Sequence, residues 1–346
     1  MVARLLPALL ALALSAADPL PLARPEVVLS DGHGPECHAS TLAKLPDGAL
    51  VAAWFSGARE GADDVVIRFT RRDPATKTWA KPRTVAAHPG IPCWNPVLVP
   101  AADGSLTLFY KVAKHIPDWE GWARRSSDGG VTWTEARRLP AGFLGPIRAR
   151  PLTLADGSLL CGSSTESAGE GRPWRAHFER CATPATPFDP AAWSRVAPAP
   201  GTPPFNAIQP TLVKLGAGQI AAYARTREGV VATTRSADDG RTWSALTATE
   251  LPNPNAGLEA LAWPDGRVGF VLNLGQNRLT LDLAIAASDG RATMQVRQLD
   301  AVAKGEVSYP AARLETTGGR ATLQVCYTRG RREIVFREFE VTDLTR

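Results

Sequence analysis

The chain has 346 residues, with 39 Lys and Arg against 34 Asp and Glu, which gives a formal net charge of +5. That charge is mild for the length, and Lys and Arg do not cluster as they do in nucleic-acid-binding proteins, so no nucleic-acid partner is expected. A modest positive charge suits an anionic sugar, although it would serve solubility equally well. The length allows a large core, and an all-β chain of this size can form one domain.

Residues 1–17 have the three parts of a secretory signal peptide. Arg4 supplies the positive charge, residues 5–14 form an apolar run, and residues 15–17 are small, as a cleavage site requires. The apolar run is too short to span a bilayer. We therefore expect a secreted or periplasmic mature chain, residues 18–346, that forms a single domain without a membrane span and is a monomer.

A hairpin signal then recurs six times at intervals of about 50 residues, as in repeat proteins. In each copy a turn with glycine, often Asp-Gly, precedes a run such as LVAAWF that alternates apolar with small or polar residues, which indicates a tight turn followed by a strand. The turn glycines are Gly48, Gly104, Gly157, Gly218, Gly266 and Gly318.

A unit of this length matches one four-stranded blade, so the sequence predicts an all-β fold, a six-bladed β-propeller. Residues 333–341 are expected to form an outer strand of the last blade, and residues 26–29 to complete that blade from the other end of the chain. The alternative of two β-sandwiches fits the even spacing less well.

The five cysteines are Cys37, Cys93, Cys161, Cys181 and Cys326. They form neither a CxxC pair nor a zinc pattern with histidine, and the five histidines lack ligand spacing, so neither a metal nor another cofactor is expected. The odd number leaves at least one thiol unpaired within the chain. Cys161 and Cys181 could bridge two strands of one blade.

A second motif recurs later in the repeats. The pattern SxDxGxTW occurs in full at Ser126 to Trp133 and again at Ser236 to Trp243, and worn copies occupy residues 73–79 and 288–290. In such a turn the Asp and Ser side chains bond backbone amides, Gly supplies an unusual dihedral angle, and Trp packs beneath. A calcium site at Asp128 or Asp238 is a weaker alternative.

With these two motifs, the mature chain resembles the sialidase (neuraminidase) superfamily over essentially its whole length, and most closely its divergent, Asp-box, BNR-repeat-like branch. The resemblance implies a propeller that acts on glycans as a glycoside hydrolase of the exo-α-sialidase type. Asp boxes in this superfamily lie on outer hairpins, away from the catalytic centre. They therefore indicate the fold and say little about the chemistry.

The first strand of each blade in a propeller lines the central axis, so the residues before each hairpin face one funnel. We place six residues there, often followed by proline: His38, Asn95, Arg150, Gln209, Gly257 and Tyr309. This polar ring predicts a binding site, although polar residues could also merely hydrate the axis. Trp94 could offer its face to a sugar or pack in the core. Trp174, Glu36, Arg148 and Glu166 lie close in sequence.

The resemblance also implies roles for particular residues. Sialidases use a Tyr nucleophile activated by Glu, an Asp acid/base and three arginines on the substrate carboxylate. Tyr309 matches the nucleophile, and Asp63 matches the acid/base, with Asp64 beside it. Arg59 matches an auxiliary arginine of the same loop, and Arg278 matches the third arginine.

The match is incomplete at three places. His38 stands where the first arginine is expected, and Gln209 stands where the activating Glu is expected. The second arginine falls on Val231, although Arg225 or Arg227 could reach the site from the same blade. Because an amide cannot take up a proton as a carboxylate does, these departures predict a changed substrate or mechanism.

One hypothesis is a retaining exo-glycosidase that acts on a terminal, acidic sugar. Tyr309 would attack the anomeric carbon with help from His38 or Glu36, and Asp63 would protonate the leaving oxygen. The anionic group of the sugar would be bound by guanidinium groups, which match carboxylates in shape. The arginines assigned to this task are Arg278 and Arg150.

Two other hypotheses stay open. The first is a polysaccharide lyase, in which His38 and Tyr309 exchange protons with a uronic acid while Arg150 neutralises its carboxylate. The second is a glycan-binding propeller that has lost its chemistry, as the missing arginine and Glu suggest. An unsaturated product would identify the lyase, and binding without product would identify the third class.

Overall fold

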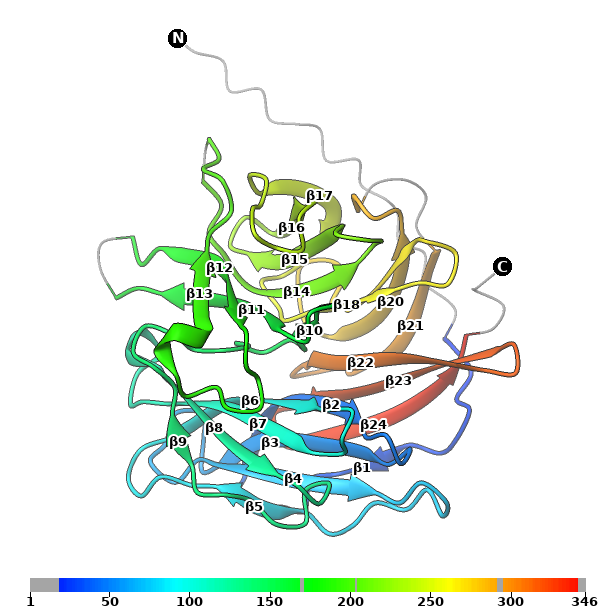
Figure 1. The fold of residues 1–346 in the computed structure, drawn as a ribbon. Helices are drawn as coiled ribbons and strands as arrows, with labels where there is room; N and C mark the ends of the chain where they lie inside the picture. Colours follow the sequence, from blue (N-terminus) through cyan, green and yellow to red (C-terminus); the bar gives the residue numbers. More distant parts are fainter. Residues whose placement is uncertain (1–18, 169–170, 203, 291–294, 342–346) are drawn as a thin grey trace.

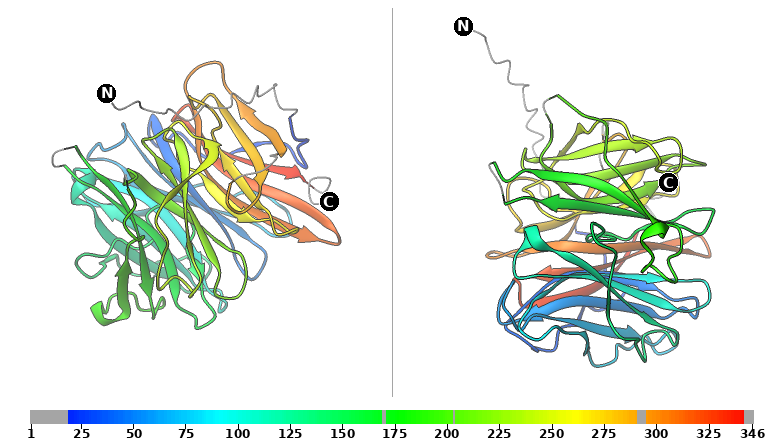
Figure 2. Two further views of the ribbon diagram at one scale, coloured as in Figure 1. Left: turned by 90° about the horizontal axis from the view of Figure 1, so that it is seen from above. Right: turned by 60° about the vertical axis from the view of Figure 1, so that its left-hand side comes forward.

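Six four-stranded antiparallel sheets surround a common axis (Figure 1). The protein is described by a computed structural model that covers residues 19–168, 171–202, 204–290 and 295–341. The proposed signal peptide, residues 1–17, lies outside these ranges. The sheets follow one another around the molecule in chain order, as the colours in Figures 1 and 2 show. The predicted six-bladed β-propeller is confirmed.

Each of the first three blades runs from an inner to an outer strand. Blade one contains β2 (Glu36–Lys44), β3 (Leu50–Gly57), β4 (Val66–Arg72) and β5 (Arg83–Ala86). Blade two contains β6 (Cys93–Pro100), β7 (Leu106–Val112), β8 (Glu120–Ser126) and β9 (Arg137–Arg138), with the short helix η1 (Ile116–Asp118). Blade three contains β10 (Leu152–Thr153), β11 (Leu159–Glu166), β12 (Trp174–Cys181), η2 (Pro190–Ala192) and β13 (Trp193–Val196).

The other three blades complete the ring. Blade four contains β14 (Ala207–Lys214), β15 (Ile220–Thr226), β16 (Val230–Ser236) and β17 (Thr247–Pro252). Blade five contains β18 (Glu259–Ala262), β19 (Val268–Leu272), β20 (Thr280–Ala286) and β21 (Gln295–Ala301). Blade six contains β22 (Val307–Thr317), β23 (Arg320–Arg329), β24 (Glu333–Glu340) and, from the N-terminal side, β1 (Val27–Val28).

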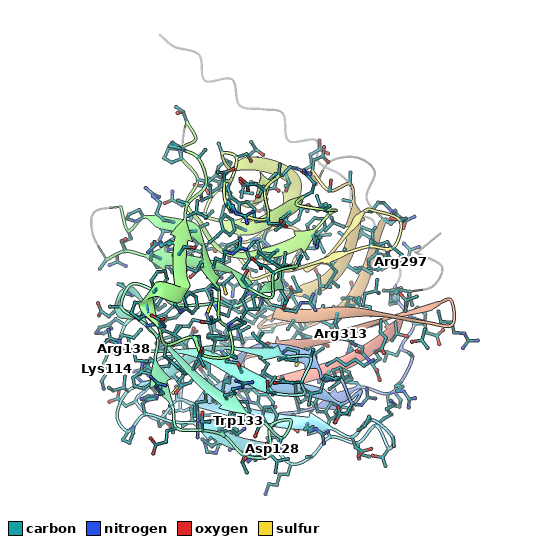
Figure 3. The ribbon with its side chains drawn as sticks, viewed as in Figure 1. Lys114, Asp128, Trp133, Arg138, Arg297 and Arg313 are labelled. Atoms are coloured by element: carbon teal, nitrogen blue, oxygen red, sulfur yellow. The ribbon has the colours of Figure 1, made fainter. Side chains whose placement is uncertain are left out.

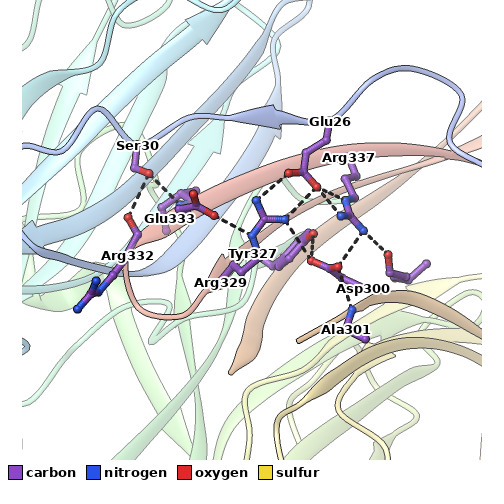
Figure 4. Close-up of polar contacts among 11 residues, drawn as sticks. Glu26, Ser30, Asp300, Ala301, Tyr327, Arg329, Arg332, Glu333 and Arg337 are labelled. Carbon is purple, nitrogen blue, oxygen red and sulfur yellow. Dashed lines mark hydrogen bonds and ion pairs between the residues drawn. The ribbon is translucent and has the colours of Figure 1, made fainter. Parts of the chain in front are cut away.

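Blade six joins the two ends of the chain, as the sequence predicted for residues 26–29 and 333–341. Val27 of β1 lies opposite Phe336 of β24. Next to this pairing the Glu26 carboxylate accepts hydrogen bonds from Arg329 and Arg337, and Asp300 of blade five accepts one from the Tyr327 hydroxyl at 2.6 Å (Figure 4). Side-chain ion pairs thus supplement the backbone bonds of a two-residue strand.

The hydrophobic core lies between neighbouring blades. One cluster joins Ile67 and Phe69 of blade one to Leu108 and Tyr110 of blade two, and these side chains are at most 2% exposed. The alternation seen in the sequence places such residues on the sheet faces, where the blades pack together. All five cysteines are buried and unpaired. The Cys161–Cys181 bridge does not form, because Cys161 lies opposite Glu179 in the β11–β12 pairing.

The two full Asp boxes form closed hydrogen-bond networks at the outer edge. The Asp128 carboxylate accepts from the backbone N–H and the hydroxyl of Thr132 at 2.8 and 2.6 Å, and the Gly130 N–H donates to the Ser126 hydroxyl at 2.7 Å. Trp133 packs edge-on against Phe69 of the preceding blade. Figure 3 shows Asp128 and Trp133 at the lower edge of the molecule. Because both Asp128 oxygens bond the protein, the structure gives the calcium alternative no support.

No helix among the described residues is long and apolar enough to cross a membrane.

Candidate functional site

The propeller places one residue from each blade at an equivalent position, nine residues before the turn glycine. These residues are Ala39, Asn95, Arg148, Gln209, Gly257 and Tyr309. Four of them have a positive φ, between 30° and 55°, although none of the four is glycine: Ala39, Asn95, Gln209 and Tyr309. The same four lie at register shifts in the inner hairpins. Such β-bulges redirect a side chain, and they are frequent next to functional sites.

This equivalence changes the predicted ring residue in blade three and shifts the equivalent position by one residue in blade one, where His38 nevertheless packs against Tyr309. His38 precedes the bulge residue Ala39 of blade one, and Arg150 follows the equivalent residue Arg148 by two positions. In blade three the inner strand β10 begins only at Leu152, and the preceding segment forms no strand, although the Ile147 N–H donates to the Gly162 carbonyl of β11 at 3.0 Å. The sequence analysis identified Arg148 only as a residue close to the predicted ring. The structure places it at the ring position of blade three.

Tyr309 lies amid three guanidinium groups. Arg225 donates a hydrogen bond from Nη1 to the phenolic oxygen at 2.7 Å. The guanidinium carbons of Arg225, Arg278 and Arg148 lie 5.3, 5.7 and 5.9 Å from the centre of the tyrosine ring. The His38 ring packs against the same ring at 4.1 Å between centroids. The structure thus brings together four side chains from the list that the sequence supplied: Tyr309, His38, Arg225 and Arg278.

Arg148 is fixed by backbone acceptors and by the shape of its surroundings. It is buried and donates to the carbonyl of Pro310 at 2.8 Å and to that of Leu258. A Cβ atom at Gly257 would lie 3.3 Å from Arg148 Nε and 3.4 Å from Tyr309 Cδ1, closer than most side chains tolerate. The missing side chain in blade five therefore leaves the space that these two groups fill.

The segment that leads to Arg148 is held by a buried lysine and a buried glutamate. Lys111 donates to the carbonyls of Pro146 and Ile147, the latter at 3.2 Å, and Glu179 accepts from the Gly145 N–H at 2.7 Å. Neither Lys111 nor Glu179 is exposed to solvent, and burial lowers the pKa of Lys111 to about 7. These bonds supplement the backbone bond between Ile147 and Gly162, because no regular inner strand forms at this point of blade three.

A further arginine at the mouth of the site was not among the predicted residues. Arg331, in the turn between β23 and β24, pairs with Glu306 at 2.6 Å and with Glu60. Glu306 also pairs with Arg278 at 3.0 Å, and Arg278 donates to the Asn255 carbonyl at 2.7 Å. The RGRR turn at residues 329–332 was the available signal, because turns after second strands open on the same face as the ring.

His38 is buried among positive charges, and this environment disfavours its protonated form. Burial lowers its pKa well below the usual value, and the charges of Arg331, Arg278, Arg225 and Arg148 lower it further. Nδ1 lies 3.0 Å from the Thr328 hydroxyl, whereas Nε2 is buried without a hydrogen-bond partner in the protein. Other buried atoms in the site without partners are Gln209 Oε1, Arg148 Nε, Arg225 Nε and Asn255 Oδ1. Buried polar groups of this kind cost free energy unless water or a ligand satisfies them.

The other predicted site residues lie around this centre. Asp63 is exposed and forms an ion pair with Lys114, and Arg59 of the same loop is also exposed. Asn95 is 4% exposed, and its carbonyl accepts from Lys111 at 3.4 Å.

Trp94 is 5% exposed, donates from Nε1 to the Ala113 carbonyl, and packs against Phe55 and Trp119. The edge of its ring also lies beneath Gly61. Neither face of the Trp94 ring is open. Trp94 therefore packs in the core and does not offer a face to a sugar, which was the other prediction.

Glu166 lies at the end of β11, close to this centre. Burial raises the pKa of its carboxyl group, while the charges of Arg225 and Arg227 act in the opposite direction. Both guanidinium groups lie over the Trp174 ring, at 5.4 and 4.3 Å. The sequence had marked Glu166 and Trp174 only as neighbours of the ring.

Over the described ranges, no group of three or more His, Cys, Asp or Glu side chains is placed to hold a metal ion.

The fold and the ring define a sialidase-like β-propeller, and the comparisons with known proteins agree. Residues 48–321 match the model of the BNR repeat-like domain, so the chain belongs to that family. A comparison with curated protein sequences found no significant match.

Several solved structures share the fold at low sequence identity. A protein of unknown function from Dyadobacter fermentans superposes with a TM-score of 0.73 at 16% identity, over 93% of this chain and 99% of that one. A Hadza microbial sialidase gives 0.72 at 17% identity, over 92% of this chain and 69% of that one. The intramolecular trans-sialidase of Ruminococcus gnavus gives 0.66 at 14% identity, over 90% and 95%. Identities this low establish the shared fold alone.

Proposed function

We propose that the protein is an exported glycoside hydrolase that removes a terminal acidic sugar from glycans, with Tyr309 as its nucleophile. The hydrogen bond from Arg225 to the Tyr309 hydroxyl, within a group of three guanidiniums, carries this proposal. A cation that donates to the phenolic oxygen stabilises the phenolate, which is the nucleophilic form. The same guanidinium groups are suited to a substrate carboxylate.

His38 completes the activation of the nucleophile. The Glu of the sialidase pattern is replaced here by Gln209, whose amide cannot take the phenolic proton. We assign His38 Nε2, which has no hydrogen-bond partner in the protein, as the acceptor of the phenolic proton, because the His38 ring packs on the Tyr309 ring. Arg148, rather than the predicted Arg150, would contribute the third guanidinium. The sugar would bind with its anionic group among these arginines and its anomeric carbon over the phenol.

The experiment is a panel of substrates tested with the purified protein and its Tyr309→Phe variant. Aryl sialosides, aryl glucuronides and neutral aryl glycosides are followed for released phenol. We expect release only from acidic glycosides, and we expect the variant to lose at least about 1,000-fold in kcat because no nucleophile remains. An unchanged melting temperature would show that the variant folds. Hydrolysis by the variant at the wild-type rate would contradict the proposal.

A uronate lyase is the second candidate, and the unpartnered His38 Nε2 beside Tyr309 favours it. The His–Tyr pair could exchange protons with a uronic acid while Arg148 or Arg278 neutralises its carboxylate. Incubation with uronate oligosaccharides would then yield an unsaturated, ultraviolet-absorbing product without released phenol from the aryl panel. Saturable glycan binding that survives Tyr309→Phe, without any product, would point instead to a binding protein.

A further inference from the structure

A pocket of about 180 Å³ lies between blades two and three. Trp119, Leu139 and Phe143 supply apolar and aromatic walls. Polar groups occur at its ends, among them Arg195 and Arg138, and Figure 3 shows Arg138 on the left-hand side of the molecule. Aromatic faces combined with a few polar groups are the usual surroundings of a bound sugar ring or other small ligand.

The pocket and the ring share a stretch of β11. Ser164, Thr165 and Glu166 line the pocket in succession. The Ser164 hydroxyl also accepts a hydrogen bond from the N–H of the ring residue Gln209 at 3.2 Å. Two residues further on, Glu166 lies opposite Trp174 in the β11–β12 pairing, and the guanidinium of Arg225, which donates to Tyr309, lies over the Trp174 ring at 5.4 Å. A ligand that fills the ring would therefore meet the pocket at Glu166.

We propose that this pocket binds the second sugar of the substrate, the one released on cleavage, and that Glu166 donates the proton to the glycosidic oxygen between the two sugars. The inference rests on the proposed function, because it assigns the leaving-group side of the same reaction. It replaces Asp63 in the role that the sialidase resemblance implied for that residue.

Glu166 suits a proton donor better than Asp63 does. A general acid must hold its proton near the working pH, and partial burial serves this purpose. Burial acts in that direction on Glu166, which lies half-buried between the ring and the pocket. The side chain of Asp63 is 62% exposed and forms an ion pair with the Lys114 ammonium, so it lies in solvent and away from the wall that the pocket shares with the ring.

The reaction then balances in two steps. As the bond between Tyr309 Oη and the anomeric carbon forms, the glycosidic C–O bond breaks, and its electron pair stays on the leaving oxygen, which takes the Glu166 proton. The phenolic proton passes to His38 Nε2. In the second step the Glu166 carboxylate takes a proton from water, whose oxygen bonds to the anomeric carbon as the bond to Tyr309 breaks. The tyrosinate then recovers its proton from His38.

The test compares two leaving groups on the acidic sugar that the wild type hydrolyses. One is a second sugar, which needs protonation and fills the pocket, and the other is fluoride, which needs neither. We expect Glu166→Gln to lower kcat/KM at least 100-fold on the disaccharide and less than tenfold on the glycosyl fluoride. We expect Asp63→Asn to change neither more than tenfold. Equal losses on both substrates in Glu166→Gln, or a disaccharide-specific loss in Asp63→Asn, would overturn the assignment.

The pocket is tested separately with Phe143→Ala. We expect a loss of tenfold or more in kcat/KM on the disaccharide and no change on the fluoride, because only the disaccharide reaches that wall. Val131→Ala, which truncates a side chain that is 59% exposed at the outer rim, is the control and leaves both rates unchanged. A Phe143→Ala variant that retains full activity on the disaccharide would exclude the pocket. Failure of the wild type on every acidic glycoside would instead reject the proposed function itself.

Discussion

The outer Asp boxes and the central ring are built from the same repeat and treat their polar groups in opposite ways. At the rim, the Asp238 carboxylate accepts from the N–H and the hydroxyl of Thr242 at 2.9 and 2.6 Å. At the centre, His38 Nε2 and Gln209 Oε1 are buried and have no partner in the protein. The contrast concerns the carboxylates of the turns, since Trp133 Nε1 of an Asp box is also buried without a partner in the protein. A carboxylate that is bonded within its own turn serves the fold, whereas buried polar groups at the centre are available to a bound partner.

The largest expected effect concerns the ring alone. Arg225→Met removes the donor to the Tyr309 hydroxyl and keeps most of the side-chain volume. We expect kcat to fall about 100- to 1,000-fold, which is the range measured for the loss of one donor to a developing negative charge. Steady-state kinetics on the best acidic glycoside check it. An unchanged kcat would mean that the hydrogen bond from Arg225 to Tyr309 only stabilises the fold, as the hydrogen bonds of the Asp boxes do.

The second effect concerns the rim alone. Gly130 has φ +93°, and a Cβ atom there would lie 2.3 Å from the Phe69 ring. We expect Gly130→Ala to lower the free energy of unfolding by about 2–4 kcal/mol, from the backbone conformation and the overlap together, with kcat unaffected. Gly104→Ala is the matched control, since Gly104 has φ +82° and open space around it. Urea unfolding should show a smaller loss there, about 1 kcal/mol.

The third prediction concerns the pH dependence of stability, which should differ between a buried aspartate inside a blade and an aspartate at the rim. Burial raises the pKa of Asp282 to about 6, from 3.8. Between these values the folded state holds a proton that the unfolded state has released, so stability falls as the pH rises through this window. We expect Asp282→Asn to be more stable than the wild type at pH 7, by about 1–2 kcal/mol, and equal to it near pH 4. A constant difference across this range would contradict the shift.

The smallest expected effect concerns Asp238 at the rim, whose contribution to stability depends on pH in the opposite direction. Hydrogen bonds from Thr242 and Ser236 hold the pKa of Asp238 far below its ordinary 3.8. The stability that this carboxylate contributes is therefore present above pH 3.8 and is lost as the pH falls towards its lowered pKa. Asp238→Asn should be less stable than the wild type at neutral pH, and the difference should narrow in acid. Thermal unfolding of the wild type, Asp282→Asn and Asp238→Asn at several pH values tests both predictions.

The sequence predicted the fold because the turns of the blades recur along the chain with the same residue types. Gly266 and the other turn glycines have positive φ, and the SxDxGxTW turns need particular residues at particular places, so each copy is visible in the chain. The closing of blade six by residues 26–29 followed from the same count. The sequence also supplied Tyr309, His38, Arg225 and Arg278, three of them through the resemblance or the repeat position.

What the sequence missed depends on contacts between segments far apart in the chain. Arg148 could not be chosen over Arg150 because blade three lacks a regular inner strand, and the hold of Lys111 and Glu179 on that segment is visible only in three dimensions. Trp94 looked open because its covering by Gly61 comes from another blade.

The way in which blade six closes also determines when the site around Tyr309 can assemble during synthesis of the chain. Tyr309 lies on β22, in the one blade that needs a strand from the start of the chain, and the neighbouring strands β23 and β24 come last in the sequence. A ribosome therefore finishes five blades before it supplies the nucleophile, and β1 must wait for β24. The ring of guanidiniums around the phenol cannot assemble on a nascent chain. Whatever reaction the centre performs therefore begins only after β24 has been synthesised and has paired with β1.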